Sequence, residues 1–328
     1  MRVGITMFRE ITEEKAKLAR QLGVSSLVVH TPDLGGEGYW RFSDLLHLKE
    51  HARAEGLELV AIENMPRSWY DKIMLGLEGK EEQIECWCRT LENMGKAGIK
   101  VLGYDWMLGG VSRTCMHSKG RGGARVTEFD YELVRNAPAE KMDAQYADAL
   151  LMNISAEDLW KNCLAFLKEV IPVAESSGVV MALHPDDPPI SQLGGMNRIF
   201  CSVDAFKKSM EEVPSESNRI EFCQGTFAEM GCDIYGTIKA FGKRIAYAHL
   251  RNVKGRVPKF SEAFIDEGDI DMLEAMRAYK EGGFDGLLLP DHPPVMVGDE
   301  IWSPFFPVGG DRGWSYTIGY IKGLLRAL

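Results

Sequence analysis

Short apolar runs alternate with longer amphipathic segments along the whole chain. The predicted strands cover residues 2–8, 26–30, 58–64, 100–106, 179–184, 220–224, 245–250 and 286–290. The predicted helices follow them, at residues 12–21, 43–55, 81–97, 156–177, 203–212, 233–241, 269–280 and 316–327. This alternation is typical of parallel strands joined by helical crossovers. Eight such units predict an α/β fold, a single closed (β/α)8 TIM barrel over residues 1–328.

Several residues mark the predicted helix ends. Ser155 precedes the helix at 156–177 and predicts an N-cap, with Asp158 completing an approximate capping box. A glycine follows each of four helices, as expected of a left-handed C-terminal residue. These glycines are Gly23, Gly56, Gly98 and Gly178.

One interval, residues 108–154, is too long for an ordinary loop of such a barrel. It follows a predicted strand, and therefore lies on the face where barrel active sites form. Two interpretations stay open, a lid over the site or an insertion with no role. The arginines Arg113, Arg121 and Arg125 either meet an anion there or are solvated.

Composition excludes several classes of function. The formal charge of −10, with dispersed basic residues, argues against nucleic acid as a partner. Seven cysteines at irregular spacing do not resemble a disulfide framework. No stretch approaches the ~20 apolar residues that cross a bilayer. We therefore expect a cytoplasmic protein with a small-molecule substrate and no membrane partner.

Four predicted strands in the second half end on residues that bind metals. These are His184, Cys223, His249 and Asp291. Because the carboxyl ends of parallel strands share one face, the four side chains are expected to surround one point. Each residue alone is more often a packed core residue, but the set predicts a metal site.

Further polar residues adjoin these strand ends. Asp186 and Asp187 either support a metal-bound imidazole or make turn hydrogen bonds, and we favour the turn role for at least one of them. Neighbouring residues face opposite ways, so Asp291 can hold a metal while His292 reaches a substrate as general acid or base. The alternative is that His292 packs against the following prolines. For Glu63, the alternative to a substrate contact is an ion pair inside the barrel mouth.

Across most of its length the chain resembles the mannonate dehydratases, metal-dependent barrels of the xylose-isomerase-like group. The resemblance rests on motifs in a fixed order, above all HPDDPP and PDH with a strand-end cysteine and HLRN between them. Its segments are IEN-P at 63–66, SRT at 112–114, EDLWKN at 157–162, HPDDPP at 184–189, NRI at 197–199, HLRN at 249–252, EGDIDM at 267–272 and PDH at 290–292.

The resemblance implies a manganese site formed by the same His184, Cys223, His249 and Asp291 quartet, with Fe²⁺, Co²⁺ and Zn²⁺ left open. It implies dehydration of D-mannonate to 2-keto-3-deoxy-D-gluconate, with His292 transferring protons and a tyrosine near the C-terminus assisting. We assign that role to Tyr316, while Trp314 stays open as the counterpart of the family tyrosine. A cation at the site would stabilise the enediolate formed beside the substrate carboxylate. Guanidinium groups match carboxylate geometry. We therefore assign substrate binding to Arg113, Arg198, Arg251, Asn252 and Glu63.

Three departures from the family fall near the predicted substrate. Leu289 stands where the family commonly has an arginine, Asp105 where it has an asparagine, and Trp314 where it has a tyrosine. Two other functions therefore stay open, a sugar isomerase or epimerase with the same barrel and metal, and a barrel that binds a sugar acid without converting it. A homodimer is expected, because exposed apolar helix faces on barrels often support dimers.

Overall fold

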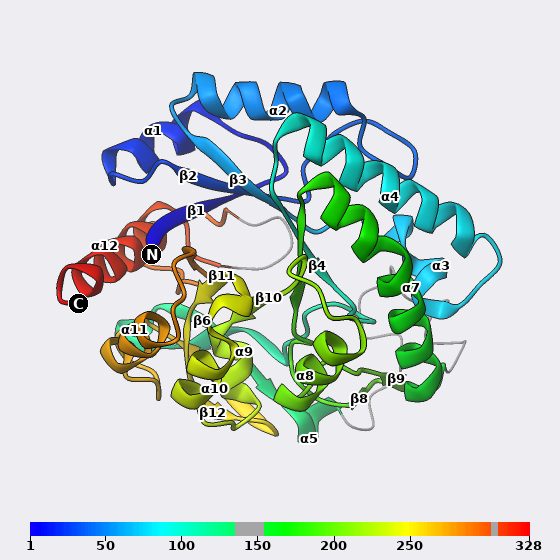
Figure 1. Cartoon of the computed structure of the whole chain (residues 1–328). Helices are drawn as coiled ribbons and strands as arrows, with labels where there is room; N and C mark the ends of the chain where they lie inside the picture. The colour runs from blue at the N-terminus through cyan, green and yellow to red at the C-terminus, as the bar shows by residue number, and fades with distance from the viewer. Residues whose placement is uncertain (135–153, 303–307) are drawn as a thin grey trace.

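The computed structural model describes residues 1–134, 154–302 and 308–328, and its centre is a closed barrel of eight parallel strands. The strand order is β1-β14-β11-β10-β7-β4-β3-β2 (Figure 1). All eight predicted strands are confirmed to within two residues at either end. They are β1 Arg2–Phe8, β2 Ser26–His30, β3 Glu58–Glu63, β4 Val101–Asp105, β7 Val180–His184, β10 Asn218–Cys223, β11 Ile245–Leu250 and β14 Leu287–Pro290.

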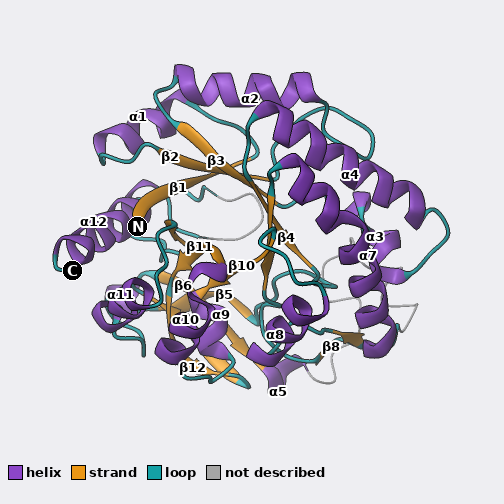
Figure 2. Cartoon of the chain, viewed as in Figure 1, coloured by secondary structure: helices purple, strands orange, loops and turns teal. Residues whose placement is uncertain are grey.

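Helices form a ring outside the strands (Figure 2). The predicted helices correspond to α1 Glu13–Gln21, α2 Phe42–Ala54, α4 Lys80–Ala97, α7 Ala156–Ser177, α8 Val203–Glu212, α10 Ile234–Phe241, α11 Met272–Glu281 and α12 Asp311–Arg326. The sequence did not predict the short helices α3 Asp71–Leu75, α5 Tyr131–Val134 and α9 Gln224–Glu229, nor the 3-10 turns η1 Arg67–Trp69, η2 Arg121–Gly123 and η5 Gly242–Arg244. Helix α12 begins earlier than the predicted 316, because Gly313 and Trp314 already lie buried in its first turn.

The predicted helix ends are confirmed. The Ser155 hydroxyl accepts a hydrogen bond from the Asp158 amide at 3.0 Å, and so caps the first turn of α7. Gly98 and Gly178 are left-handed C-cap residues, with φ of 71° and 64°. Gly23 and Gly56 also have positive φ. These ends set the length of each crossover, and thus which strand residues reach the barrel mouth.

A second sheet lies beside the barrel mouth. It comprises β5 Cys115–Lys119, β6 Arg125–Asp130, β12 Asn252–Arg256 and β13 Lys259–Ala263, in the order β12-β13-β6-β5 with antiparallel pairing. We call it the cap sheet. Its strand β12 begins two residues after β11 ends. Arg125 at the start of its strand β6 pairs with Val295, which follows β14. A two-stranded sheet pairs β8 Gln192–Leu193 with β9 Met196–Asn197.

The cap sheet changes the interpretation of the interval 108–154. Residues 115–130 form a hairpin rather than irregular structure, because β6 pairs with β13 as well as β5. Residues 135–153 of the interval lie outside the described residues. The choice between a lid and an insertion with no role therefore stays open.

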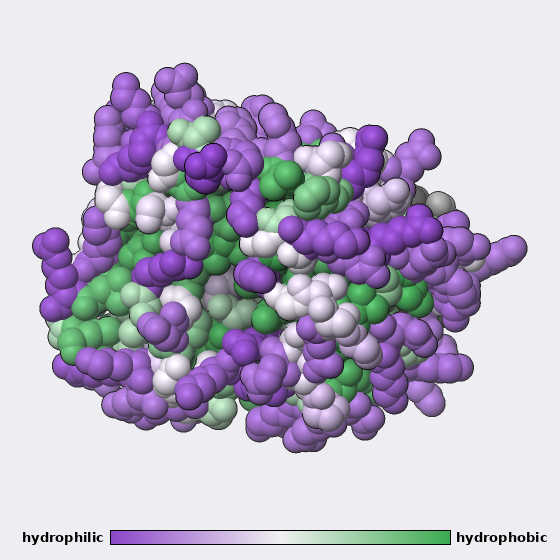
Figure 3. Space-filling view, turned by 45° about the horizontal axis from the view of Figure 1, so that its top comes forward, coloured by the Kyte–Doolittle hydropathy of each residue, from purple (hydrophilic) through white to green (hydrophobic). Residues whose placement is uncertain are grey.

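Buried apolar side chains of the described residues form two main compartments and a small cluster of Phe129, Leu193 and Phe260. The larger core lies between strands and helices, and a smaller cluster inside the barrel contains Val28, Ala182 and Leu289. Figure 3 shows hydrophilic side chains over most of one face, with hydrophobic ones between them. Both chain ends lie close together in Figure 1, where α12 contacts β1. Within the described part of the chain, no helix has the length and apolar character needed to span a membrane.

Candidate metal centre and its surroundings

The four predicted metal ligands end four consecutive strands of the barrel, β7, β10, β11 and β14. Cys223 is in register with His249, and His249 with Leu289, two residues before Asp291. The side chains therefore reach the mouth at nearly one level. Proline after His184 ends β7 there, because proline cannot continue the ladder of hydrogen bonds.

The structure brings all four side chains together. His184, Cys223 and His249 offer ligand atoms that lie within 4.8 Å of one another. Asp291 Oδ2 lies 3.7 Å from Cys223 Sγ and 3.8 Å from His249 Nδ1. Two imidazoles, a thiolate and a carboxylate form a set that suits a divalent transition metal. That these residues bind an ion stays a prediction.

The hydrogen bonds of the two histidines fit metal binding. His184 Nδ1 lies 2.7 Å from the Pro185 carbonyl, to which it can donate, leaving Nε2 for a ligand bond. His249 Nε2 lies 3.2 Å from Glu63 Oε2, so a proton on Nε2 has a carboxylate acceptor. His249 Nδ1 is buried and has no hydrogen-bond partner. A buried nitrogen without a partner is costly unless a cation occupies its lone pair, and carboxylate partners of this kind commonly orient metal-binding histidines.

Charge at the centre also suits a cation. Burial alone would raise the pKa of Cys223, but the positive charge of Arg251 and the His184 imidazole lower it to about 5. The thiol is therefore ionised at neutral pH, as a metal ligand must be. Burial lowers the pKa of His184, whereas Glu221 and Cys223 raise it, to about 10 overall. A bound metal would take the place of such protons.

A second group of ligand atoms lies deeper in the barrel. Glu63, Glu221 and His249 also approach one another within 4.8 Å. Burial and the nearby Glu63 carboxylate raise the pKa of Glu221 to about 8. Tyr247 donates to Glu221. The sequence analysis missed Glu221, although its position two residues before Cys223 places both side chains on the same side of β10.

Glu63 makes the contacts expected of an ion pair inside the barrel mouth, the alternative to a substrate contact. Its carboxylate lies 3.2 Å from His249 Nε2 and 3.6 Å from His30 Nε2, inside the barrel mouth. Only 5% of the residue is exposed. These contacts support the ion-pair interpretation, and substrate binding by Glu63 stays a prediction.

His292 lies beside this centre. Its Nε2 is 3.8 Å from Asp291 Oδ1, and its Nδ1 is 2.9 Å from Glu262 Oε1 and 2.8 Å from Arg251 Nη1. The backbone of His292 is left-handed, with φ of 42°. Such a conformation is uncommon for residues other than glycine and often occurs at functional sites. The polar contacts of the ring show that it does more than pack against the following prolines.

Two of the predicted substrate arginines belong to a buried ion cluster. Arg113 Nη2 lies 2.9 Å from Asp187 Oδ2 and 2.7 Å from Glu262 Oε1. Arg251 Nη2 lies 2.9 Å from both Asp187 Oδ2 and Glu229 Oε1. The exposed fractions of the two arginine side chains are 0% and 1%. Both guanidinium groups thus hold protein carboxylates, and a direct contact with substrate stays a prediction.

The two aspartates after His184 have different surroundings. Asp187 pairs with the two arginines; burial opposes ionisation, but Arg113 and Arg251 lower its pKa overall. Asp186 Oδ2 accepts a hydrogen bond from the Phe200 amide at 2.8 Å, and so holds the loop that leads to α8. Among the described contacts, neither aspartate contacts His184. The turn hydrogen bond expected for at least one of them is replaced by the bonds to Phe200, Arg113 and Arg251.

The other two predicted substrate residues, Arg198 and Asn252, donate hydrogen bonds to backbone carbonyls. Arg198 donates to the carbonyls of Pro188 and Gly110 and is 2% exposed. Asn252 donates to the carbonyls of Ile265 and Ile270 at 3.0 and 2.9 Å. These bonds brace the loops around the mouth, and roles in substrate binding stay predictions.

Tyr316, the predicted catalytic tyrosine, lies in α12 and is 36% exposed. Its hydroxyl is 3.4 Å from Arg121 Nη2, and its ring packs edge-on against Phe264. Arg121 in turn binds Asp266. These neighbours belong to the rim of the cap sheet rather than the metal centre, so a catalytic role for Tyr316 stays a prediction that the observed contacts do not favour.

The departures from the family have local explanations. Asp105, at the end of β4, forms an ion pair of 2.9 Å with Arg67. Leu289 fills the inside of the barrel with Val28 and Ala61. Trp314 is buried and stacks on Trp302, with the ring centroids 5.4 Å apart.

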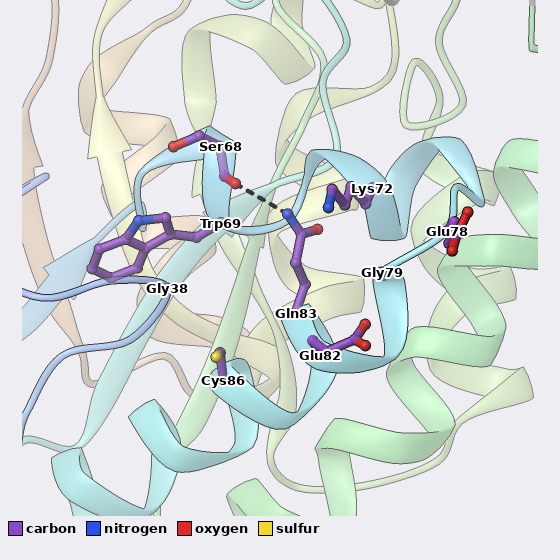
Figure 4. A pocket seen from close by; sticks show the side chains of 9 residues that line it. All are labelled: Gly38, Ser68, Trp69, Lys72, Glu78, Gly79, Glu82, Gln83 and Cys86. Atoms are coloured by element: carbon purple, nitrogen blue, oxygen red, sulfur yellow. Dashed lines mark hydrogen bonds between the residues drawn. The ribbon is translucent and has the colours of Figure 1, made fainter.

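A hollow of about 600 Å³ lies on the outer wall, between α3 and α4 (Figure 4). In its wall, Gln83 Nε2 donates to the Ser68 carbonyl at 3.0 Å. Its lining includes Trp69 and Cys86 but none of the predicted site residues. It is therefore separate from the barrel mouth.

A (β/α)8 barrel with His, Cys and Asp side chains gathered at its mouth, next to a further histidine, is typical of the class of metal-dependent TIM-barrel enzymes. Comparison with known proteins narrows this class. The family model described as D-mannonate dehydratase (UxuA) matches residues 7–328. The chain belongs to the mannonate dehydratase family, which makes it a hydro-lyase.

Individual relatives agree with this assignment. A mannonate dehydratase of Thermotoga maritima is 31% identical over 93% of this chain and 91% of its own. One from Enterococcus faecalis is 31% identical over 88% and 86%. The crystal structure of mannonate dehydratase from Streptococcus suis serotype 2 has a TM-score of 0.88 at 28% identity, covering 100% of this chain and 94% of that chain. A D-psicose 3-epimerase from Clostridium cellulolyticum H10 shares the fold, with a TM-score of 0.60 at 14% identity over 99% of both chains.

Proposed function

We propose that this protein removes water from D-mannonate to give 2-keto-3-deoxy-D-gluconate, with one divalent cation held by His184, Cys223, His249 and Asp291. One observation carries the proposal. Four ligand-type side chains from consecutive strands converge in a buried site where His249 Nδ1 has no hydrogen-bond partner. The names of the relatives supply the substrate. The comparisons favour neither a sugar isomerase or epimerase nor a binding protein without activity.

The chemistry divides between the cation and the chain. When bound, a divalent cation supplies Lewis-acid stabilisation of the charge that develops on the substrate carboxylate as the neighbouring carbon loses its proton. His292 Nε2 lies on the side of Asp291 and therefore moves a proton at the substrate, either from C2 or to the departing 3-hydroxyl. The buried surroundings keep water from competing for these charges.

The finer assignments belong to the same proposal. We infer Mn²⁺ as the cation from the family resemblance, since two imidazoles, a thiolate and a carboxylate also suit Zn²⁺ and the affinity order of divalent metals does not select Mn²⁺. We also infer a sugar acid bound at the mouth, a homodimer and a cytoplasmic location. Glu63, Arg113, Arg198, Arg251 and Asn252 would shape the substrate pocket, directly or through the loops that they hold.

The test is an assay of protein stripped of metal and reloaded with Mn²⁺, against a panel of aldonic acids. We expect a 2-keto-3-deoxy acid from D-mannonate, and a rate reduced about 10²–10⁴-fold in His292→Asn, as expected for loss of an acid–base group. His117→Asn, on the exposed β5, is the matched control and should retain activity. A product of unchanged mass would instead indicate isomerisation, and binding without any product would indicate an inactive barrel. Full activity in His292→Asn would remove that residue from its role.

A further inference from the structure

Glu262 approaches the proposed acid–base histidine from outside the barrel. It lies on β13 of the cap sheet and is 4% exposed. Its Oε1 is 2.9 Å from His292 Nδ1, the ring nitrogen that points away from Asp291. The opposite nitrogen, Nε2, lies 3.8 Å from Asp291 Oδ1. A carboxylate at Nδ1 thus leaves Nε2 directed toward the metal centre.

The charges around Nδ1 favour a proton on that nitrogen. The carboxylates of Asp187, Glu229 and Glu262 face two guanidinium groups, Arg113 and Arg251, and Asp291 Oδ2 also lies 3.5 Å from Arg251 Nε. Arg251 Nη1 also lies 2.8 Å from Nδ1, but it donates to Glu262 as well. The guanidinium hydrogens of Arg251 thus have carboxylate acceptors of their own, and an N–H on Nδ1 directed at Glu262 forms a charge-assisted hydrogen bond.

The cap sheet fixes the position of Glu262. Glu262 is in register with Val253 of β12, and the adjacent Ser261 is in register with Glu128 of β6. Strand β6 in turn makes two backbone hydrogen bonds, of 3.0 and 2.9 Å, between Arg125 and Val295. Val295 lies three residues after His292. The sheet therefore connects the strand that carries Glu262 to the segment that follows His292.

We propose that Glu262 is a positioning residue for His292, which accepts the Nδ1 proton and holds Nε2 toward the substrate. The proposal rests on the function proposed above for His292 and adds a residue to it. Because Glu262 touches the ring and not the substrate, it is expected to influence turnover more than substrate binding.

The first test observes the imidazole without catalysis. Nitrogen-15 NMR of metal-free protein with labelled histidine distinguishes the two neutral tautomers of each ring. His292→Asn identifies the His292 signals among the seven histidines. We expect the proton on Nδ1 in the unmodified protein, and a shift toward the other tautomer in Glu262→Gln. Glu128→Gln, the same substitution on neighbouring β6, should leave the His292 signals in place.

The second test measures turnover of Mn²⁺-loaded protein. We expect Glu262→Gln to lower kcat about 10–100-fold, the usual effect of removing an outer partner, while KM and metal content stay within about 3-fold. Glu262→Asp keeps the charge that Arg113 and Arg251 require but withdraws the carboxylate from Nδ1. Glu262→Asp should fold and still lose turnover. It therefore tests the positioning role even if Glu262→Gln is unstable.

The outcomes separate this proposal from the function. Unchanged tautomer and unchanged kcat in Glu262→Asp would overturn the positioning role. Another outcome is that the unmodified protein shows no dehydratase activity while the His292 tautomer still shifts in the Glu262 variants. That result would support the pairing of Glu262 with His292 and would overturn the proposed reaction.

Discussion

Asp186 is a carboxyl group that folding removes from water. It is 1% exposed, and its Oδ1 has no hydrogen-bond partner, while Oδ2 accepts from the Phe200 amide. Burial raises its pKa to about 6 from an ordinary value of 3.8, although the positive charge of Arg198 and the Phe200 hydrogen bond oppose the shift. The folded protein therefore retains a proton that the unfolded chain has lost between these values.

This difference predicts how Asp186→Asn changes stability with pH. A group with a raised carboxyl pKa contributes stability below about pH 4 that is lost as pH rises toward 6. Relative to the unmodified protein, Asp186→Asn should gain up to roughly 3 kcal/mol of unfolding free energy between pH 4 and pH 7. Urea unfolding at several pH values measures it, with the exposed Glu211→Gln as control. A variant that loses relative stability as pH rises would contradict the assignment.

Helix α7 shows what a single cap contributes to an element. It starts at Ala156, and Ser155 caps its N-terminal end. The Ser155 hydroxyl accepts from the Asp158 amide and donates to the Asp158 carboxylate at 2.7 Å. The helix buries one face, including Phe166, against the barrel. Packing holds the helix in place, and the cap decides where it begins.

The cap predicts a measurable loss of stability. Ser155→Ala leaves amides of the first turn without a partner and should cost about 1 kcal/mol of unfolding free energy. Ser176→Ala is a matched control near the other end of α7, where the hydroxyl caps no amide. It should change stability by less than about 0.5 kcal/mol. Equal losses in both variants, measured by urea unfolding, would remove the cap from this role.

At the scale of the whole molecule, the metal centre links strands from separate parts of the chain. His184 and Asp291 are more than a hundred residues apart, and the barrel closes through β14 pairing with β1. A cation bound by β7, β10, β11 and β14 would join half of the barrel strands. Binding to the folded state alone must stabilise that state.

Metal should therefore raise the thermal stability of the stripped protein. Mn²⁺ at 100 times its Kd contributes about 2.7 kcal/mol, which corresponds to roughly 4 °C in apparent Tm for a domain of this size. Cys223→Ser should lose most of this increase, and Cys86→Ser, on α4, should keep it. Differential scanning calorimetry with a chelator as reference measures the effect. A Cys223→Ser protein with the full increase would argue for the deeper Glu63, Glu221 and His249 group instead.

The barrel and its four candidate ligands follow from sequence because both depend on local periodicity. Apolar runs of strand length mark each strand, and the parallel arrangement brings their last residues to one face. The hairpin at residues 115–130 and the strand carrying Glu262 have weaker patterns, since one side of the cap sheet lies over polar groups.

The tertiary structure alone decided which charged groups are partners. The pattern HLRN placed Arg251 near the mouth but did not reveal that Glu229 and Glu262 would occupy its guanidinium group. Arg113 meets Glu262 across 149 positions of sequence. A run of residues encodes which face is buried, whereas the neutralisation of a buried charge depends on every element that reaches the same place.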